Sequence, residues 1–362
     1  MDFHFLTGSY ADKGTQAIEW WQFDKAAGYL TRVGGISGID RPSFIAVHPD
    51  QHRFVACSEV ADGELVAYEL DKEHSAIRER NRRSANGAHP AHVCFDETGE
   101  WVLAVNYSGG NVNLYPFLPD GTLGELADAV QHEGTGPVVS RQDAAHPHSV
   151  FQIPATDRFL VSDLGSDKII EYKLDSGAGR LITVNETVAP TGSGPRHLAF
   201  HHDQPFVYSL EELSSTLSVY EWQENNGLVH RQRVSLVPEK FDGENTSAEV
   251  MVSEDDQLLY ATNRGHDSVA VFEIRGDGLV ELKEITSAGG KSPRHFAMVP
   301  GSPWLITANE QSNCLAVLHL ENGVPYAVQS VARTQSPVCI KAIRLALNKE
   351  AVPGTVDTIE FD

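Results

Sequence analysis

The sequence predicts an all-β fold, a single seven-bladed β-propeller, and three observations carry this prediction. One pattern recurs six times along the 362 residues. Each copy contains four strand-like segments, in which β-branched and aromatic residues alternate with polar ones between turns rich in Gly, Asp and Pro. A seventh copy is divided between the two ends of the chain. Four strands in a repeat of about 40–50 residues are typical of propeller blades, and no helical period competes with them.

The first two strands of each copy are the easiest to align. The copies read RPSFIAVHPDQHRFVACSE, HPAHVCFDETGEWVLAVNY, HPHSVFQIPATDRFLVSDL, GPRHLAFHHDQPFVYSLEE, TSAEVMVSEDDQLLYATNR and SPRHFAMVPGSPWLITANE. A third strand follows each of them, for example LVAYEL or LSVYEW, and most copies close with a more polar fourth strand. The initial prolines recur at blade-sized intervals, as Pro42, Pro90, Pro147, Pro195, Pro293 and Pro337.

The seventh blade requires strands from both ends of the chain. SPVCIKAIRLAL at the C-terminal end matches a first strand, and FHFLTGS and AIEWWQF at the N-terminal end match the strands that should follow it. Joining them in one blade closes the ring and leaves no free sheet edge between the first and last blades. We therefore expect residues 1–350 to form the propeller, residues 351–362 to be a polar tail, and residues 124–145 to be an inserted loop.

Composition and charge narrow the range of partners. The chain has 28 Lys and Arg against 50 Asp and Glu, a formal net charge of −22. This balance argues against nucleic acid and anionic membrane surfaces as partners. It allows a small anionic ligand where arginines gather locally. The four cysteines form no CxxC pair, no secretory signal precedes the first strand, and no apolar stretch reaches the roughly 18 residues that span a bilayer. These features favour a reduced, cytoplasmic protein.

The first strand of each blade should line the central channel, so equivalent positions in the copies form rings. Directly after the initial proline, or its counterpart, the copies carry Ser43, Ala91, His148, Arg196, Ala248, Arg294 and Val338. The next ring contains Phe44, His92, Ser149, His197, Glu249, His295 and Cys339. The ends of the second strands add Asn106, Asp163, Glu211, Asn263 and Asn309, followed by Tyr107, Leu164, Glu212, Arg264 and Glu310.

These rings bring arginines, histidines and carboxylates to one axis, where such groups must pair or bind a ligand. Polar rings also hold water and hydrogen bonds between blades, and the recurring Asn106, Asn263 and Asn309 fit such a structural role. His148 and Arg264 each occur in only one copy at their position. A dedicated site requires this irregularity, whereas a structural ring does not.

No motif for a metal or cofactor stands out. HPAH, HPHS and the adjacent His201 and His202 lack the spacing of a strong zinc signature, and residues three apart on a strand point to opposite faces. GxSxG, P-loop and dinucleotide fingerprints are also missing from the sequence. We therefore expect neither a metal nor a cofactor.

The motifs HPHSV, GPRH, SLEELSS, TNRGHDS and SPRHF together resemble the seven-bladed 6-phosphogluconolactonase family, which is related to the fungal carboxy-cis,cis-muconate lactonizing enzymes. The resemblance covers nearly the whole chain. It implies a catalytic site made from His148, Arg196, Glu212 and Arg264. Arg294 and His197 match further family positions, and with their ring neighbours Glu249 and His295 they are the expected substrate-binding residues.

The doublet Glu211–Glu212 leaves a choice of carboxylate. Counting back from the aromatic residue of the third strand, Tyr220 against Phe272, aligns Glu212 with Arg264 and favours Glu212.

The resemblance implies hydrolysis of a sugar-acid lactone, with 6-phosphoglucono-δ-lactone as the leading substrate. Such a reaction needs a general base for water and a positive environment for the oxyanion and the anionic substrate. Arginines suit a phosphate or carboxylate because their planar fork pairs with two oxygens. The alternatives are a lactonizing cycloisomerase that uses the same cationic pocket, and a non-enzymatic propeller scaffold, which would require an exposed apolar face to bind a partner. The sequence makes no prediction of oligomeric state.

Overall fold

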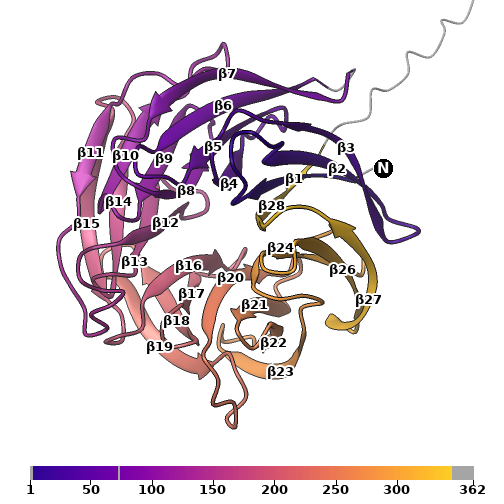
Figure 1. Ribbon diagram of the computed structural model, residues 1–362. Coiled ribbons are helices and arrows are strands. Elements are labelled where there is room, and N and C mark those ends of the chain that lie inside the picture. Colours follow the sequence, from indigo (N-terminus) through magenta and orange to yellow (C-terminus); the bar gives the residue numbers. More distant parts are fainter. Residues whose placement is uncertain (1–2, 72–73, 345–362) are drawn as a thin grey trace, which may run out of the picture.

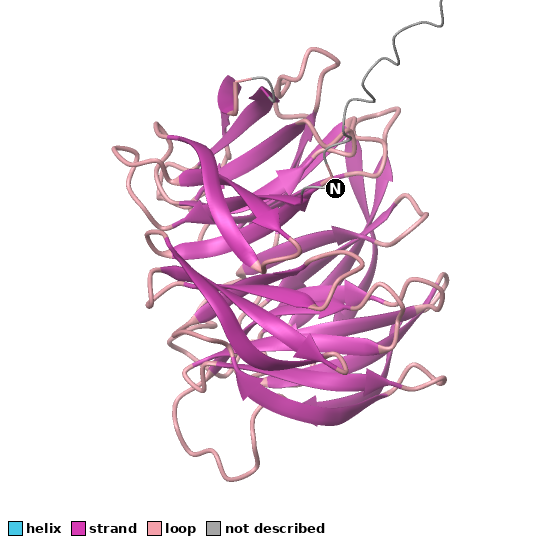
Figure 2. Ribbon diagram, turned by 90° about the vertical axis from the view of Figure 1, so that its right-hand side faces the viewer, coloured by secondary structure: helices cyan, strands magenta, loops and turns pink. Residues whose placement is uncertain are grey.

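The computed structural model describes residues 3–71 and 74–344, and every regular element in those ranges is a β-strand. Seven four-stranded antiparallel sheets are arranged around one axis, as Figure 1 shows. Figure 2, turned by 90°, shows the connecting loops gathered at the two faces of the ring. The prediction of an all-β, seven-bladed propeller is confirmed. The described residues contain no helix long and apolar enough to cross a membrane.

Each blade is named here by its innermost strand. The β4 blade contains β4 (Pro42–Val47), β5 (Arg53–Ser58), β6 (Glu64–Asp71) and β7 (Ala76–Ser84). The β8 blade contains β8 (Pro90–Phe95), β9 (Trp101–Asn106), β10 (Asn111–Pro116) and β11 (Asp128–Gln131). The β12 blade contains β12 (Pro147–Gln152), β13 (Arg158–Asp163), β14 (Lys168–Asp175) and β15 (Arg180–Val188). The β16 blade contains β16 (Pro195–Phe200), β17 (Phe206–Glu211), β18 (Thr216–Gln223) and β19 (Gly227–Ser235).

Three blades complete the ring. The β20 blade contains β20 (Thr246–Val252), β21 (Leu258–Arg264), β22 (Ser268–Ile274) and β23 (Val280–Ser287). The β24 blade contains β24 (Pro293–Met298), β25 (Trp304–Asn309), β26 (Cys314–Glu321) and β27 (Val324–Arg333). The β28 blade contains β28 (Pro337–Ile343), β1 (Phe3–Ser9), β2 (Ile18–Asp24) and β3 (Tyr29–Ile36).

The two ends of the chain meet in the β28 blade. β28 pairs with β1 in an antiparallel register that sets His4 opposite Ile343 and Gly8 opposite Cys339. The expected closure is therefore confirmed: a strand from each end shares one sheet, so the ring has no open edge between its first and last blades. The polar tail predicted for residues 351–362 lies outside the described residues.

The prediction that residues 124–145 are an inserted loop is wrong for part of this segment. Residues Asp128–Gln131 form β11, the fourth strand of the β8 blade, and Asn111 of β10 pairs with Gln131. A strand of four residues is too short for alternation to distinguish it from a loop. The loop proper runs from residue 132 to residue 146.

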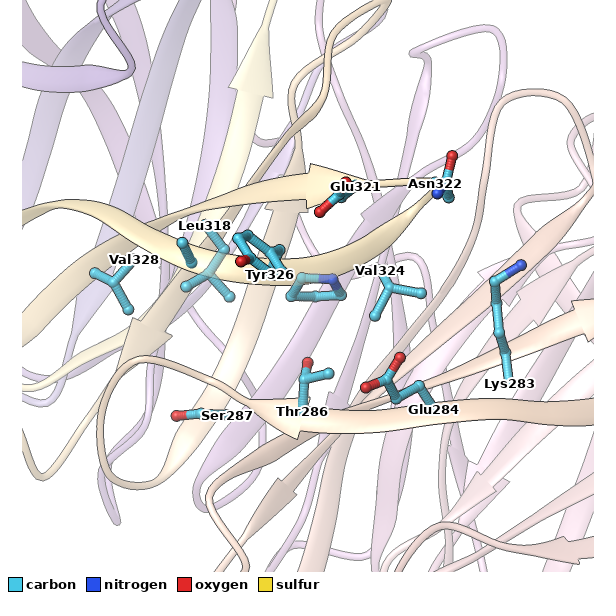
Figure 3. A pocket seen from close by; sticks show the side chains of 12 residues that line it. Lys283, Glu284, Thr286, Ser287, Leu318, Glu321, Asn322, Val324, Tyr326 and Val328 are labelled. Atoms are coloured by element: carbon cyan, nitrogen blue, oxygen red, sulfur yellow. The ribbon is translucent and has the colours of Figure 1, made fainter.

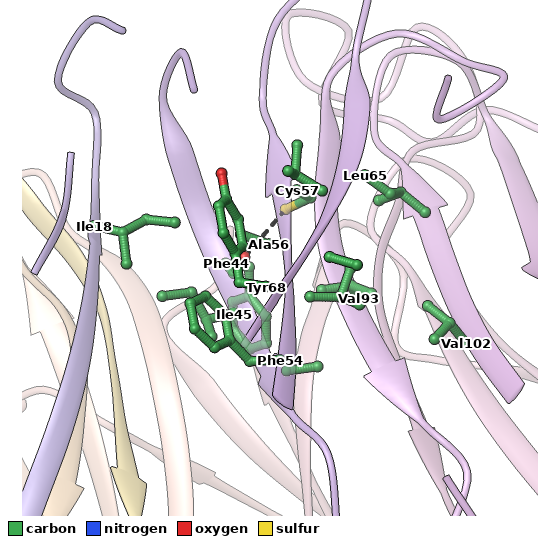
Figure 4. Close-up of a cluster of buried hydrophobic side chains, with 14 of the residues drawn as sticks. Ile18, Phe44, Ile45, Phe54, Ala56, Cys57, Leu65, Tyr68, Val93 and Val102 are labelled. Atoms are coloured by element: carbon green, nitrogen blue, oxygen red, sulfur yellow. Dashed lines mark hydrogen bonds between the residues drawn. The ribbon is translucent and has the colours of Figure 1, made fainter. Parts of the chain in front are cut away.

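The core lies between neighbouring blades. Figure 4 shows one cluster, in which Phe54 and Tyr68 stack at 5.0 Å between ring centroids within the β4 blade and Val93 and Val102 approach from the β8 blade. Each sheet buries apolar side chains on both faces against its neighbours. The long buried runs of the second and third strands are the expected consequence of this packing. The four cysteines are unpaired, and three of them are buried in these interfaces.

Every inner strand carries a β-bulge at its start. In the β16 blade, Pro195 pairs with Glu211 and His197 with Leu210, so Arg196 is the extra residue. The same register shift occurs in the other six blades. Successive side chains of a regular strand point to opposite faces. A bulge re-aims them, and here both Arg196 and His197 make contacts inside the channel.

The recurring asparagines bond one blade to the end of the preceding blade. The side-chain amides of Asn106, Asn263 and Asn309 donate to the carbonyl groups of Ala85, Leu236 and Ala288, at 2.9, 2.7 and 3.5 Å. Each of these carbonyl groups directly follows the outermost strand of the preceding blade. The repeat is therefore structural at this position, as its regularity indicates.

Candidate active site

An ion cluster centred on Glu212 lies where the inner strands begin, and we call this part of the channel its arginine end. Glu212 follows β17 directly and is 3% exposed. Its Oε2 accepts a hydrogen bond from Arg196 Nε at 2.8 Å and lies 3.0 Å from Arg264 Nη2. Its Oε1 accepts from Arg141 Nη2 at 2.7 Å. One carboxylate thus holds three guanidinium groups.

The charges of the cluster determine its protonation. Burial alone would raise the pKa of Glu212, but Arg264, Arg196 and Arg141 outweigh it and hold this pKa well below its usual range. Burial lowers the pKa of Arg196 to about 9, with Arg294 and Arg264 acting in the same direction. At neutral pH the carboxylate is ionised and these arginines are charged, so the cluster carries more positive than negative charge.

Arg141 reaches the cluster from the loop of residues 132–146. His132 Nδ1 lies 2.9 Å from the Asp163 carboxylate at the start of the loop. Gln142 Nε2 donates to Asp167 at 2.7 Å near its end. These two contacts hold the loop on either side of Arg141, whose side chain is 36% exposed. Our sequence reasoning missed this residue because it has no counterpart in the repeats. The sequence feature that could have pointed to Arg141 is that it is the only Lys or Arg in residues 124–145.

His148 occupies the bulge position of β12 and lies beside the cluster. Its ring centroid is 5.7 Å from that of Tyr107 and 5.3 Å from that of His197. Burial and then Arg196 lower the pKa of His148 well below its ordinary value. The imidazole is therefore neutral at neutral pH. Its buried Nδ1 has no hydrogen-bond partner within the part of the chain that the structure describes.

Arg294 has the same bulge position in β24 and borders the cluster from another side. Its guanidinium lies 5.0 Å from the centroid of the Tyr10 ring, and Tyr10 donates a hydrogen bond to Glu59 at 3.0 Å. No hydrogen bond or ion pair of Arg294 is seen among residues 3–71 and 74–344. Burial alone would lower its pKa, but Tyr10, Glu59 and Glu310 raise it. This guanidinium is charged.

A layer of rings closes the channel beneath the arginines. The Phe44 centroid lies 3.9 Å from that of His92, 5.9 Å from that of His197 and 5.8 Å from that of His295. These aromatic and imidazole side chains come from β4, β8, β16 and β24, so residues from four different blades meet in the central channel. Glu249 of β20 contacts two of the histidines, His197 Nδ1 at 3.0 Å and His295 Nε2 at 3.1 Å.

The structure brings the eight predicted site residues into these two levels. His148, Arg196, Glu212, Arg264 and Arg294 belong to the arginine end, and His197, Glu249 and His295 to the layer beneath it. It also separates the two candidate carboxylates. Glu211 is fully buried within its own blade, where it accepts from Ser218 at 2.6 Å and from Arg233 at 2.9 Å. The register places Glu211 opposite Pro195 and Asn263 opposite Ser247, so Glu212 corresponds to Arg264, as the count from Tyr220 indicated.

Other hollows of the surface lack this concentration of buried charge. A groove of about 460 Å³ lies between β23 and β27 on the outside of the ring, and Figure 3 shows Thr286 and Glu284 facing Val324 and Tyr326 across it. A second hollow of about 430 Å³ lies beneath the ring layer and includes Lys341. Among the described residues, no group of three or more His, Cys, Asp or Glu side chains is arranged to hold a metal ion.

Comparisons with known proteins agree with the architecture. A family model described as "Lactonase, 7-bladed beta-propeller" matches residues 4–342. The chain is 30% identical over 340 residues to a 6-phosphogluconolactonase of Bacillus subtilis, and this alignment covers 92% of this chain and 96% of that protein.

Two solved structures have the same fold along their whole length. The periplasmic gluconolactonase PpgL of Pseudomonas aeruginosa superposes with a TM-score of 0.90 at 26% identity, over 96% of this chain and 100% of that chain. A protein from Lactobacillus plantarum superposes with a TM-score of 0.89 at 28% identity, over 95% of this chain and 100% of that chain.

Proposed function

The chain belongs to the seven-bladed β-propeller lactonase family, and on that premise we propose that it hydrolyses a sugar-acid lactone, with 6-phosphoglucono-δ-lactone as its substrate. The observation that carries this proposal is the excess of guanidinium groups at the arginine end of the channel. Arg141, Arg196 and Arg264 share the single carboxylate of Glu212, and Arg294 next to them has no anionic partner within hydrogen-bonding distance among the residues that the structure describes.

This excess of charge suits a substrate that carries an anion of its own. A plain sugar lactone is neutral and develops one negative charge on its carbonyl oxygen as water attacks. A phosphorylated lactone adds close to two more charges at neutral pH. Several fixed guanidinium groups in a buried site can accommodate both. The net charge of −22 gives the whole protein no long-range attraction for an anion, so the local arginines must hold it.

We assign the transfer of the proton to His148. A general base must be unprotonated at the working pH and must have a free lone pair. His148 is neutral, and its Nδ1 is unpartnered among the described residues. Glu212 is ionised, but both of its oxygens are already bonded to arginines, so it has no free oxygen to accept a proton from water. We therefore assign Glu212 the task of holding the arginines in position.

The reaction follows from these assignments. His148 takes a proton from water while the water oxygen bonds to the lactone carbonyl carbon. The oxyanion faces Arg196 and Arg264, whose buried Nε has no protein acceptor in the described part of the chain. The bond between the carbonyl carbon and the ring oxygen then breaks, and the departing oxygen recovers the proton from His148. General-base catalysis contributes about 10²–10⁴-fold, and the arginines add oxyanion stabilisation.

A substrate panel tests the proposal. The purified protein is assayed with 6-phosphoglucono-δ-lactone, glucono-δ-lactone and carboxymuconate, each against the spontaneous reaction. We expect enzymatic hydrolysis with the largest kcat/KM for the phosphorylated lactone. His148→Asn should abolish most of it, whereas His230→Asn, on the exposed outer strand β19, is the matched control. Turnover of carboxymuconate alone would identify a cycloisomerase, and no turnover of any compound would refute the proposal.

A further inference from the structure

The side chain of Tyr107 lies at the arginine end of the channel, and the hydrolytic steps above leave its hydroxyl group unused. Tyr107 directly follows β9, and the register of the β8 blade gives it the position that Glu212 has in the β16 blade. Its side chain is half-buried, and its ring lies 5.7 Å from that of His148, centroid to centroid. Tyr107 therefore borders the ion cluster on the side of the proposed base.

The loop of residues 132–146 holds both the ring and the hydroxyl group of Tyr107. The ring of His146 stacks on that of Tyr107, with 4.5 Å between the centroids and 7° between the planes. His146 Nδ1 also donates a hydrogen bond to the carbonyl oxygen of Tyr107 at 2.8 Å. From the same loop, Arg141 Nη2 donates to the hydroxyl oxygen at 3.3 Å. The loop that adds a guanidinium group to the cluster thus also fixes the orientation of this phenol.

The direction of the contact with Arg141 leaves the phenolic proton unused. A guanidinium group can only donate, so the hydroxyl oxygen is the acceptor and its own O–H points elsewhere. Within residues 3–71 and 74–344, no acceptor for this O–H is seen. Burial raises the pKa of Tyr107 although Arg141 opposes this shift, so the phenol keeps its proton at neutral pH. The pair therefore offers a hydroxyl donor directly beside a guanidinium group.

The exposure of the arginines indicates which end of a substrate this pair faces. The side chain of Arg141 is 36% exposed, against 3% for Arg196 and 13% for Arg264. The proposed function places the reacting carbonyl group against the two deeper arginines. A phosphate group is costly to remove from water, so it fits the more exposed part of the site, where Tyr107 and Arg141 lie.

We propose that Tyr107 is a specificity-determining residue, whose hydroxyl group donates a hydrogen bond to the phosphate of the substrate beside Arg141. This inference rests on the proposed function for the identity of the substrate, and it adds the contact that distinguishes a phosphorylated lactone from a plain one. Hydrogen bonds to charged groups are stronger than those between neutral groups. We therefore expect the loss of this hydroxyl group to weaken binding of the phosphorylated lactone about tenfold.

The variant Tyr107→Phe tests the contact, because it keeps the ring that stacks on His146 and removes only the hydroxyl group. In steady-state assays we expect KM to rise about tenfold for 6-phosphoglucono-δ-lactone and less than about twofold for glucono-δ-lactone, with kcat changed less than about twofold. Tyr115→Phe is the matched control, since it removes a hydroxyl group of the same blade that donates to the carbonyl oxygen of Ser84 at 2.9 Å. It should leave both KM values unchanged.

A double-mutant cycle separates a direct contact from support of Arg141. If Tyr107 binds the phosphate itself, Tyr107→Phe should raise the KM for the phosphorylated lactone in the Arg141→Ala background as well. No further rise in that background would overturn the inference, because Tyr107 would then act only by holding Arg141. An equal rise in KM for both lactones would also overturn it.

Inorganic phosphate makes the test independent of turnover. In isothermal titration, the Kd for phosphate should be about tenfold higher in Tyr107→Phe than in the wild type. If the wild type hydrolyses neither lactone, the proposed function is refuted, and the titration still decides the phosphate contact. Equal Kd values for phosphate in the two proteins would overturn that contact.

Discussion

Replacing Glu212 with Gln should destabilise the protein and at the same time increase its affinity for phosphate. The substitution removes the charge that three arginines share and nearly preserves the side-chain shape. Removing one partner of a buried ion pair costs about 3–5 kcal/mol, and the half-exposed pair with Arg141 adds only about 0–1 kcal/mol. Since the amide oxygen of Gln can still accept one of the hydrogen bonds, we expect the lower limit, about 3 kcal/mol.

A loss of this size can be measured by thermal unfolding. The entropy of unfolding of about 2.1 cal/mol/K per residue translates it into a Tm lower by about 4 °C for a chain of this length. The pKa of Glu212 is lowered in the folded protein, so its contribution is present above the pKa of an unfolded glutamate and is lost as the pH falls towards the folded value. The difference in Tm between wild type and variant should therefore narrow below about pH 4.5.

Inorganic phosphate distinguishes this loss from general damage to the fold. The variant leaves Arg141, Arg196 and Arg264 without their shared anion, so phosphate should raise its Tm more than that of the wild type. Glu211→Gln is the matched control, because the adjacent carboxylate is equally buried but bonds within its own blade. It should lower the Tm but respond to phosphate no more than the wild type does. An unchanged Tm in Glu212→Gln, or equal phosphate responses in all three proteins, would refute the ion cluster as we describe it.

The remaining predictions concern activity. Arg196→Lys keeps the charge but loses the planar fork, so KM for the phosphorylated lactone should rise about fivefold in steady-state assays, and an unchanged KM would contradict the assigned contact. Arg141→Ala should raise that KM about tenfold but the KM for the plain lactone less than about twofold; Arg275→Ala, in a surface ion pair, is its control. His148→Asn should lower kcat about 10²–10⁴-fold with little change in KM. Because the His148 pKa is lowered, wild-type kcat/KM should stay level until well below pH 6.5, and a limb at 6.5 would point to another base. Exhaustive chelation should leave activity intact, since no ligand set has suitable spacing; loss restored by a divalent ion would reveal a metal site.

The site could be predicted in part because propeller blades repeat. Equivalent positions in the copies must form rings, so aligning six segments predicts that Arg196, Arg294 and His148 lie on one level. The alignment of Glu212 with Arg264 agrees with the observed register. Their catalytic and binding roles remain predictions that the assays above test.

Three features depended on the tertiary structure. The repeat could not reveal Arg141, because its loop has no counterpart in other blades and its contact with Glu212 joins residues 71 positions apart. Alternation could not reveal β11, which has only four residues. The bulge at the start of each inner strand was also invisible, although it lets adjacent residues such as Arg196 and His197 both face the channel.

The sequence by itself determined the blade number, the shared terminal blade and the rings around the axis. Strand periodicity and turn residues are local, and the repeat copies them along the chain. The structure alone decided which carboxylate faces the arginines, which loop adds a fourth guanidinium and which histidine stays neutral. Those outcomes depend on distances between charges in different blades and on their burial, and such distances exist only when the ring is closed.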